Sequence, residues 1–128
     1  MKYLGVDFGD KRVGTAVSDE EGTIAFPRKT FGNNGELITM LAKLIQEEKI
    51  QKIVIGDTHS HGGASNPVSG EADVFITQLQ KATGLTVERA FEMWSSIEAS
   101  RYAPKGKEHD DAAAAAIILQ RYLDMRSP

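Results

Sequence analysis

The sequence predicts an α/β domain with a mixed five-stranded sheet and helices on both of its faces. Three strand patterns joined by short turns open the chain, and short apolar strands then alternate with helical patterns. Early hairpins produce antiparallel strands, whereas strand–helix–strand units produce parallel ones, so one sheet is expected to contain both kinds. A length of 128 residues suits a single domain over residues 1–128.

The first three strands are expected over residues 2–7, 12–18 and 23–30. In the stretch LGVDFGDKRVGTAVSD, residues 4–19, apolar side chains alternate with small or polar ones, as in half-buried strands. Gly9-Asp10 is a turn signal and predicts that the first two strands form a hairpin. Pro27 favours an edge position for the third strand, because proline lacks the N–H that a sheet ladder needs.

Helices and strands alternate in the rest of the chain. A helix capped by Asn33 or Asn34 is expected to run to about Lys49. A second helix begins at Asn66-Pro67 and stops at Gly84. Its inward-facing residues are expected to be Val74, Phe75, Ile76 and Leu79. The other expected elements are strands over residues 52–56 and 85–91 and helices over residues 95–101 and 110–124.

The alanine run at residues 112–116 of the last helix has two interpretations. Small side chains permit a close approach of the helix to the sheet, and alanine also has the highest intrinsic helix propensity. The sequence supports both equally.

Composition excludes several classes of protein. The chain has no cysteine, which excludes disulfides and thiolate metal sites, and its net charge of −3 provides no overall basic field for nucleic acid. The start MKYLGVD lacks the features of a signal peptide, and no apolar run approaches the ~20 residues needed to span a bilayer. A cytoplasmic protein without membrane contact is expected.

Three acidic positions lie at the ends of predicted elements. Asp7 is in the first strand, Glu92 follows the strand that ends at Phe91, and Asp110-Asp111 opens the last helix. Strand ends and helix starts gather at one edge of such a sheet. Carboxylates brought together there repel one another by about 4 kcal/mol per pair at 4 Å and an effective dielectric of 20. Mg²⁺ or Mn²⁺, which prefer oxygen ligands, would remove that repulsion.

Each acid also has a simpler interpretation. Asp7 can accept hydrogen bonds from the turn that follows it, as in an Asx turn. Asp110 or Asp111 can serve only as a helix cap or first-turn anion, and Glu92 can be an ordinary acid at a strand end.

The opening stretch resembles the first motif of the YqgF/RuvX family, LGxDxGxxRxGxAxSD. The closing DAAAAAIILQRYL is similar to the family pattern DxxAAxxILQxYL, and that alignment selects Asp111 over Asp110. The resemblance implies a ribonuclease H-like fold and a metal-dependent nuclease, some members maturing the 5′ end of 16S ribosomal RNA. It further implies that Asp7, Glu92 and Asp111 hold the metal, and that Lys11 and Arg12 contact substrate phosphate or brace the site.

Two segments depart from the family pattern. Residues 91–96 replace a DERxTT-like segment and keep its glutamate and two hydroxyl groups, so that Ser95 and Ser96 are expected to position the substrate backbone. Residues 56–58 replace a GLP segment, and Asp57 becomes a candidate fourth ligand or outer-shell group. His59, His61 and His109 are more simply solvated loop histidines than ligands or proton donors.

Three functions remain open from the sequence. The first is a metal-dependent nuclease acting on structured RNA or branched DNA, as a monomer or a homodimer, with further phosphate contacts from a basic run: Arg101, Lys105 and Lys107. The second is an actin-like nucleotide-binding module, although the chain is short for two such domains and contains no GxxxxGK[ST] loop. The third is a non-catalytic member that binds nucleic acid or protein.

Overall fold

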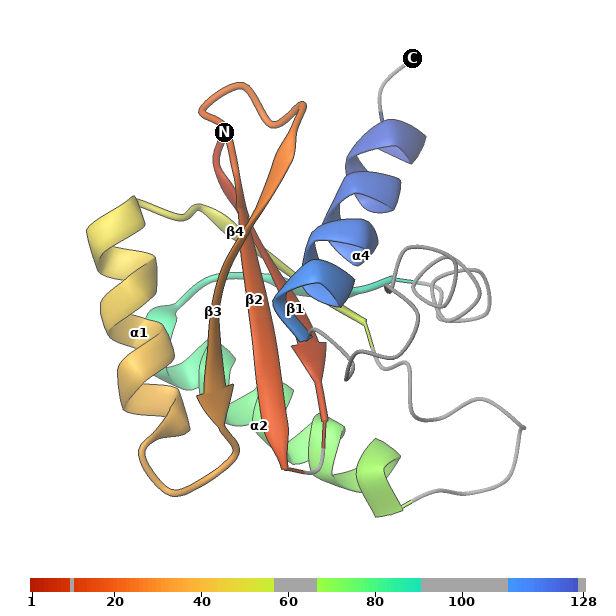
Figure 1. The fold of residues 1–128 in the computed structure, drawn as a ribbon. Coiled ribbons are helices and arrows are strands. Elements are labelled where there is room, and N and C mark those ends of the chain that lie inside the picture. Colours follow the sequence, from red (N-terminus) through yellow and green to blue (C-terminus); the bar gives the residue numbers. More distant parts are fainter. Residues whose placement is uncertain (10, 57–66, 91–110, 127–128) are drawn as a thin grey trace.

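The computed structural model describes residues 1–9, 11–56, 67–90 and 111–126, and its strands form a mixed sheet in the order β3-β2-β1-β4-β5 (Figure 1). The strands are β1 (Tyr3–Phe8), β2 (Arg12–Ser18), β3 (Ala25–Gly32), β4 (Lys52–Gly56) and β5 (Val87–Arg89). The first three strands are antiparallel, whereas β4 runs parallel to both β1 and β5. The predicted five-stranded mixed sheet is confirmed, with Pro27 in an edge strand.

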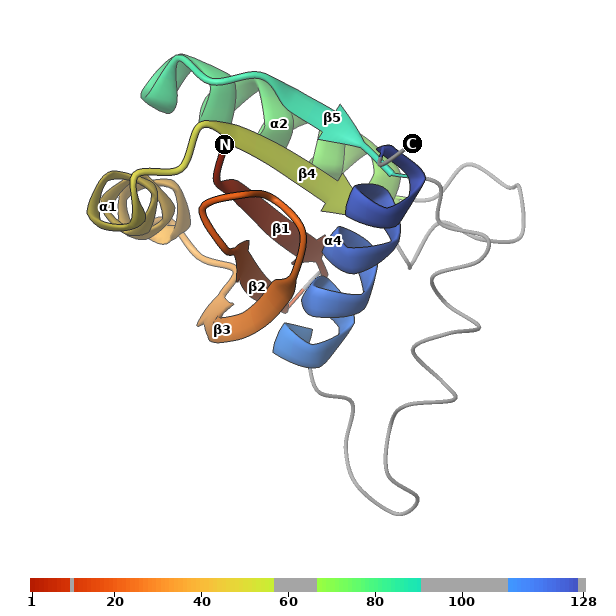
Figure 2. The ribbon, with the colours of Figure 1, turned by 90° about the horizontal axis from the view of Figure 1, so that it is seen from above.

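Helices cover both faces of the sheet, as predicted. Helices α1 (Leu37–Glu48) and α2 (Pro67–Thr83) lie on one face, and α4 (Asp111–Arg126) lies on the other (Figures 1 and 2). The second helix begins at Pro67, and Gly84 follows its end with a positive φ of 72°. That left-handed backbone conformation favours glycine, as expected for a helix stop.

The alternation of side chains along the strands divides the core into two clusters. On β1, Leu4, Val6 and Phe8 belong to the cluster under α1 and α2. Tyr3 belongs to the cluster under α4, and Asp7 shares its strand parity and therefore its face. Each central strand is thus buried on both sides, and the face that carries Asp7 is the one that α4 covers.

Two details of the helices differ from the sequence expectation. Helix α1 has Glu36 at its N-cap position, with no side-chain cap hydrogen bond. The side chain of Asn34 accepts from the Glu36 N–H in the preceding turn, and that of Asn33 donates to the carbonyl oxygen of Gly9. In α2, Val74 is 58% exposed, so its predicted inward orientation was wrong. Ala72, Phe75 and Leu79 occupy the buried face at i, i+3 and i+7, and Val74 lies off that stripe. The expected helix over residues 95–101 lies outside the described residues.

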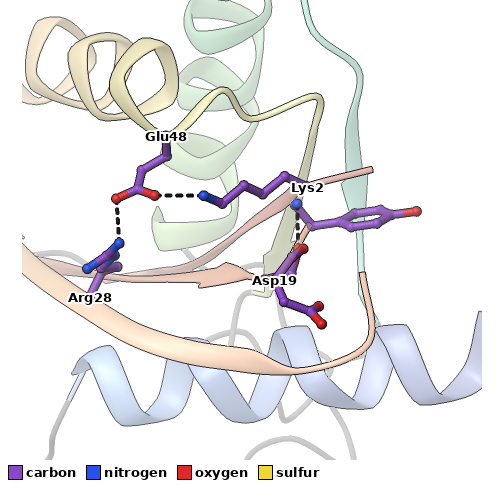
Figure 3. Close-up of polar contacts among 6 residues, drawn as sticks. Lys2, Asp19, Arg28 and Glu48 are labelled. Atoms are coloured by element: carbon purple, nitrogen blue, oxygen red, sulfur yellow. Dashed lines mark hydrogen bonds and ion pairs between the residues drawn. The ribbon is translucent and has the colours of Figure 1, made fainter. Parts of the chain in front are cut away.

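Glu48, at the end of α1, binds Arg28 of β3 and Lys2, the residue before β1 (Figure 3). Its Oε1 atom accepts from Lys2 Nζ at 2.9 Å, and its Oε2 atom accepts from Arg28 at 2.5 Å. Hydrogen bonding by Lys2 and the charge of Arg28 hold the pKa of Glu48 below its ordinary value. This contact ties the edge strand β3 to the helix layer.

Candidate active site

Asp7 is a buried acid flanked by two glycines in the sheet. It is 1% exposed and pairs with Gly14 of β2 on one side and Gly56 of β4 on the other. Cross-strand partners point to the same face, so all three positions face α4. Because glycine has no side chain, the surface of the sheet on both sides of Asp7 is open to close approach by the helix.

Helix α4 packs directly against this open surface. A Cβ placed on Gly14 would lie 1.9 Å from the main-chain carbonyl oxygen of Asp111, and one on Gly56 would lie 2.6 Å from Ile118. A Cβ on Gly5, two residues before Asp7 on the same face, would lie 2.7 Å from Leu119. The first turn of α4 is therefore in contact with the strand next to Asp7. This geometry supports the close-approach interpretation of the alanine run.

Strand β2 also holds the side chain of Asp111. The Nε atom of Arg12 donates to Oδ2 of Asp111 at 2.9 Å. The Asp111 side chain is 10% exposed and the Arg12 side chain is 54% exposed, so the guanidinium lies between the acid and solvent. Of the two expected roles of Arg12, bracing the site is the one that the contact supports directly.

Asp7 and Asp111 thus lie at the same end of the same sheet face. Antiparallel partners such as Asp7 and Gly14 have Cα atoms about 4.5–5.5 Å apart, and the backbone of Asp111 rests on Gly14. Two buried carboxylates supply hard oxygen donors of the kind that Mg²⁺ and Mn²⁺ prefer, so the donor set fits such an ion. Within the described part of the chain, no group of three or more potential metal ligands is found.

The other sequence candidates are distributed as follows. Lys11 is exposed, immediately before β2, on the turn that follows Asp7. The remaining candidates lie outside the described residues: Asp57, His59, His61, Glu92, Ser95, Ser96, Arg101, Lys105, Lys107, His109 and Asp110.

The close contact of α4 with the strand glycines was not predicted from the sequence. Gly5 and Gly14 interrupt strand patterns, and glycine within a strand often marks the close approach of another backbone. That signal was present, but it does not say which segment approaches.

A family model described as "RuvX: Holliday junction resolvase" matches residues 1–125. The chain belongs to the RuvX family. This is a family of nucleases, so the assignment favours a nuclease function over an actin-like nucleotide-binding module.

Named relatives agree with the RuvX assignment. A relative from Chlorobaculum tepidum named as a pre-16S rRNA nuclease is 35% identical, with 98% of this chain and 95% of the relative covered. A relative from Bordetella petrii with the same name is 36% identical over 94% of this chain and 93% of its own length.

Solved structures agree in fold. Thermus thermophilus RuvC in complex with a Holliday junction substrate superposes with a TM-score of 0.65 at 12% identity, covering 98% of this chain and 95% of RuvC. The fowlpox virus Holliday junction resolvase has a TM-score of 0.57 at 13% identity, covering 98% of this chain and 99% of its own. The predicted ribonuclease H-like α/β fold is confirmed. None of the described helices combines the length and the apolar character that a membrane span requires.

Proposed function

We propose that the chain is a divalent-metal-dependent nuclease in which Asp7, Asp111 and Glu92 hold Mg²⁺ or Mn²⁺. The observation that carries the proposal is the seating of Asp111 on Gly14, the cross-strand neighbour of the buried Asp7. Burial of a carboxylate costs several kcal/mol even after relaxation of its surroundings, and two carboxylates that lie close together also repel each other. A cation shared by these acids would account for Asp7 in the interior.

The residues of the chain have distinct parts in this proposal. The metal, when bound, supplies activation of water and charge stabilisation at the phosphate. Asp7 and Asp111 orient it, and Arg12 keeps Asp111 in place through the Nε–Oδ2 contact of 2.9 Å. Lys11, Ser95 and Ser96 bind the substrate backbone. A water molecule would lose a proton as its oxygen bonds to phosphorus, the P–O bond would break, and the departing oxygen would take up a proton, so that the net reaction adds water across that bond.

The first candidate substrate is a precursor of 16S ribosomal RNA, because relatives of that name cover nearly the whole chain. The second is a four-way DNA junction, which the description of the matching family favours. A resolvase must cut two strands and would act as a homodimer, whereas trimming of RNA requires only a monomer. A cytoplasmic location goes with either substrate.

Cleavage assays on both substrates test the proposal. Labelled precursor RNA and a labelled four-way junction are incubated with the protein in Mn²⁺, in Mg²⁺ and in EDTA. We expect metal-dependent cleavage that Asp7→Asn lowers by at least about 10²-fold, as for loss of a group that stabilises transition-state charge. Asp19→Asn is the matched control, since this partly exposed acid follows β2 at the end of the strand farther from Gly14. Equal cleavage by the Asp7 variant and the parent would refute the proposal.

A further inference from the structure

Asn33, directly after β3, ties down the turn between β1 and β2. Its main-chain N–H donates to the carbonyl oxygen of Lys11 at 2.9 Å. Its side-chain Nδ2 donates to the carbonyl oxygen of Gly9 at 2.8 Å. Both acceptors lie beyond Phe8 and Val13, the last residue pair of the β1–β2 ladder. One residue therefore holds the turn at two points, from the side of the edge strand.

The turn held by Asn33 connects the groups of the candidate site. Asp7 lies two residues before Gly9, and Lys11 and Arg12 follow the turn. Gly9 is buried, whereas Lys11 and Arg12 are exposed. Arg12 is anchored to Asp111 through Nε and has a side chain that is 54% exposed. A fixed turn thus presents two cations to solvent beside the buried acids.

The neighbouring asparagine has a different task. Oδ1 of Asn34 accepts from the main-chain N–H of Glu36 at 2.9 Å, and its carbonyl oxygen accepts from Leu37 at 3.1 Å. These contacts form the turn that leads into α1. The N-cap of α1 is Glu36, so the prediction that Asn33 or Asn34 caps the helix was wrong. Asn33 is directed toward the turn instead, so its side chain is not explained by helix capping.

We propose that Asn33 is a positioning residue for nucleic-acid binding. By holding Gly9 and Lys11, it keeps Lys11 in the geometry that binds a phosphate of the RNA or DNA strand. The inference rests on the proposed nuclease function and specifies where the substrate backbone lies: across the β1–β2 turn. Metal binding is separate, because Asp7 is held by β1 and the Asp111 backbone packs on Gly14. Arg12, which binds the Asp111 carboxylate, is held by its own pairing with Gly32 in the β2–β3 ladder.

The test compares Asn33→Ala with Asn34→Ala, two neighbouring replacements that each remove one side-chain hydrogen bond. Dissociation constants for precursor RNA and for a four-way junction are measured by fluorescence anisotropy in EDTA, where cleavage is blocked. Mn²⁺ affinity is measured by calorimetry without nucleic acid. Thermal unfolding of both variants establishes that they are folded.

We expect Asn33→Ala to weaken nucleic-acid binding about three- to tenfold, as for loss of one hydrogen bond that orients charged contacts. The salt slope of log K should fall by about 1, which corresponds to one phosphate contact. Asn34→Ala should bind within about twofold of the parent, and Mn²⁺ affinity should be unchanged in both variants. In a Lys11→Ala background, Asn33→Ala should weaken binding little further, because the two residues act through one turn.

Equal nucleic-acid binding by the Asn33 and Asn34 variants, in a protein that cleaves with Mn²⁺, would overturn the inference and leave the proposed function intact. Additive effects of the Lys11 and Asn33 replacements would overturn it as well. If Asn33→Ala does not fold, Asn33→Gln, which displaces the amide by one methylene, is measured in the same assays with the same expectations. A parent protein that neither binds nor cleaves nucleic acid would refute the proposed function itself.

Discussion

Gly14→Ala is predicted to displace the first turn of α4 and to abolish cleavage. The new Cβ would lie 1.9 Å from the carbonyl oxygen of Asp111 and 2.1 Å from its carbonyl carbon. Both atoms belong to the main chain, so no side-chain rotation relieves the overlap, and the helix start must move away from the sheet. Asp111 would then shift relative to Asp7, the cross-strand neighbour of Gly14.

The other glycines set the scale of the effect. Overpacking a core costs about 1–3 kcal/mol, and the main-chain overlap at Gly14 predicts a loss of about 3 kcal/mol in the free energy of unfolding. At Gly56 the overlap is with the side chain of the buried Ile118, Cδ1 at 2.6 Å and Cγ2 at 2.9 Å, and not with main-chain atoms, so a smaller loss of about 2 kcal/mol is expected. Gly35 has no atom within 4 Å and a φ outside the left-handed region. Gly35→Ala should therefore be neutral or stabilising by up to about 1 kcal/mol.

Urea unfolding followed by circular dichroism measures the free energy of each variant, and cleavage with Mn²⁺ is measured at temperatures where all are folded. The expected order of stability is Gly35→Ala, then Gly56→Ala, then Gly14→Ala. A Gly14 variant as stable as the Gly35 variant would show that α4 does not rest on β2. A destabilised Gly14 variant that cleaves at the parent rate would show that the placement of Asp111 is not needed for activity.

Three further outcomes follow from contacts of β2 and its ends. The buried Thr15 hydroxyl donates to the carbonyl oxygen of Lys29 at 2.6 Å and accepts from the Lys29 N–H at 3.1 Å, at the irregularity in the β2–β3 ladder. In urea unfolding, Thr15→Val should therefore lower the free energy of unfolding by about 1–3 kcal/mol, and Thr15→Ser, which keeps the hydroxyl, should lower it less. Arg12→Leu should lower the free energy by about 1 kcal/mol, a charged hydrogen bond discounted for the exposure of Arg12, as measured by urea unfolding. Hydrogen bonds from the backbone N–H groups of Thr23 and Ile24 lower the pKa of Asp19 from 3.8 to about 2, so the stability that ionised Asp19 contributes is complete above pH ~4 and is lost as the pH falls toward ~2. In thermal melts from pH 6 to 2, the melting temperature of the parent should therefore approach that of Asp19→Asn across this window.

Much of the fold could be predicted because it depends on local patterns. Period-two alternation marked β1 and β2, and the helical period of α1 placed Leu37, Leu41 and Leu44 on its buried side. Pro67 and Gly84 mark the start of α2 and the position just past its end through their own backbone preferences. Such signals act within a few residues, so one sequence is enough to detect them.

Contacts between distant segments could not be predicted in the same way. Asn33 or Asn34 was expected to cap the helix, because an asparagine before a helical pattern has that local preference. The actual partners of Asn33, Gly9 and Lys11, are more than 20 positions away and become neighbours only when β3 pairs with β2. Val74 was placed inward for a similar reason, since it is apolar but lies off the stripe that packs on the sheet.

By itself, the sequence determined the order of the elements, the mixed character of the sheet and the presence of an acid in its first strand, since these follow from local residue patterns. Its motifs also determined membership of the RuvX family. The tertiary structure alone decided that Asp111 rests on Gly14 beside Asp7 and that Arg12 binds its carboxylate. The physical reason is that a missing side chain permits contact but does not select the partner, which is settled only when α4 packs onto the sheet.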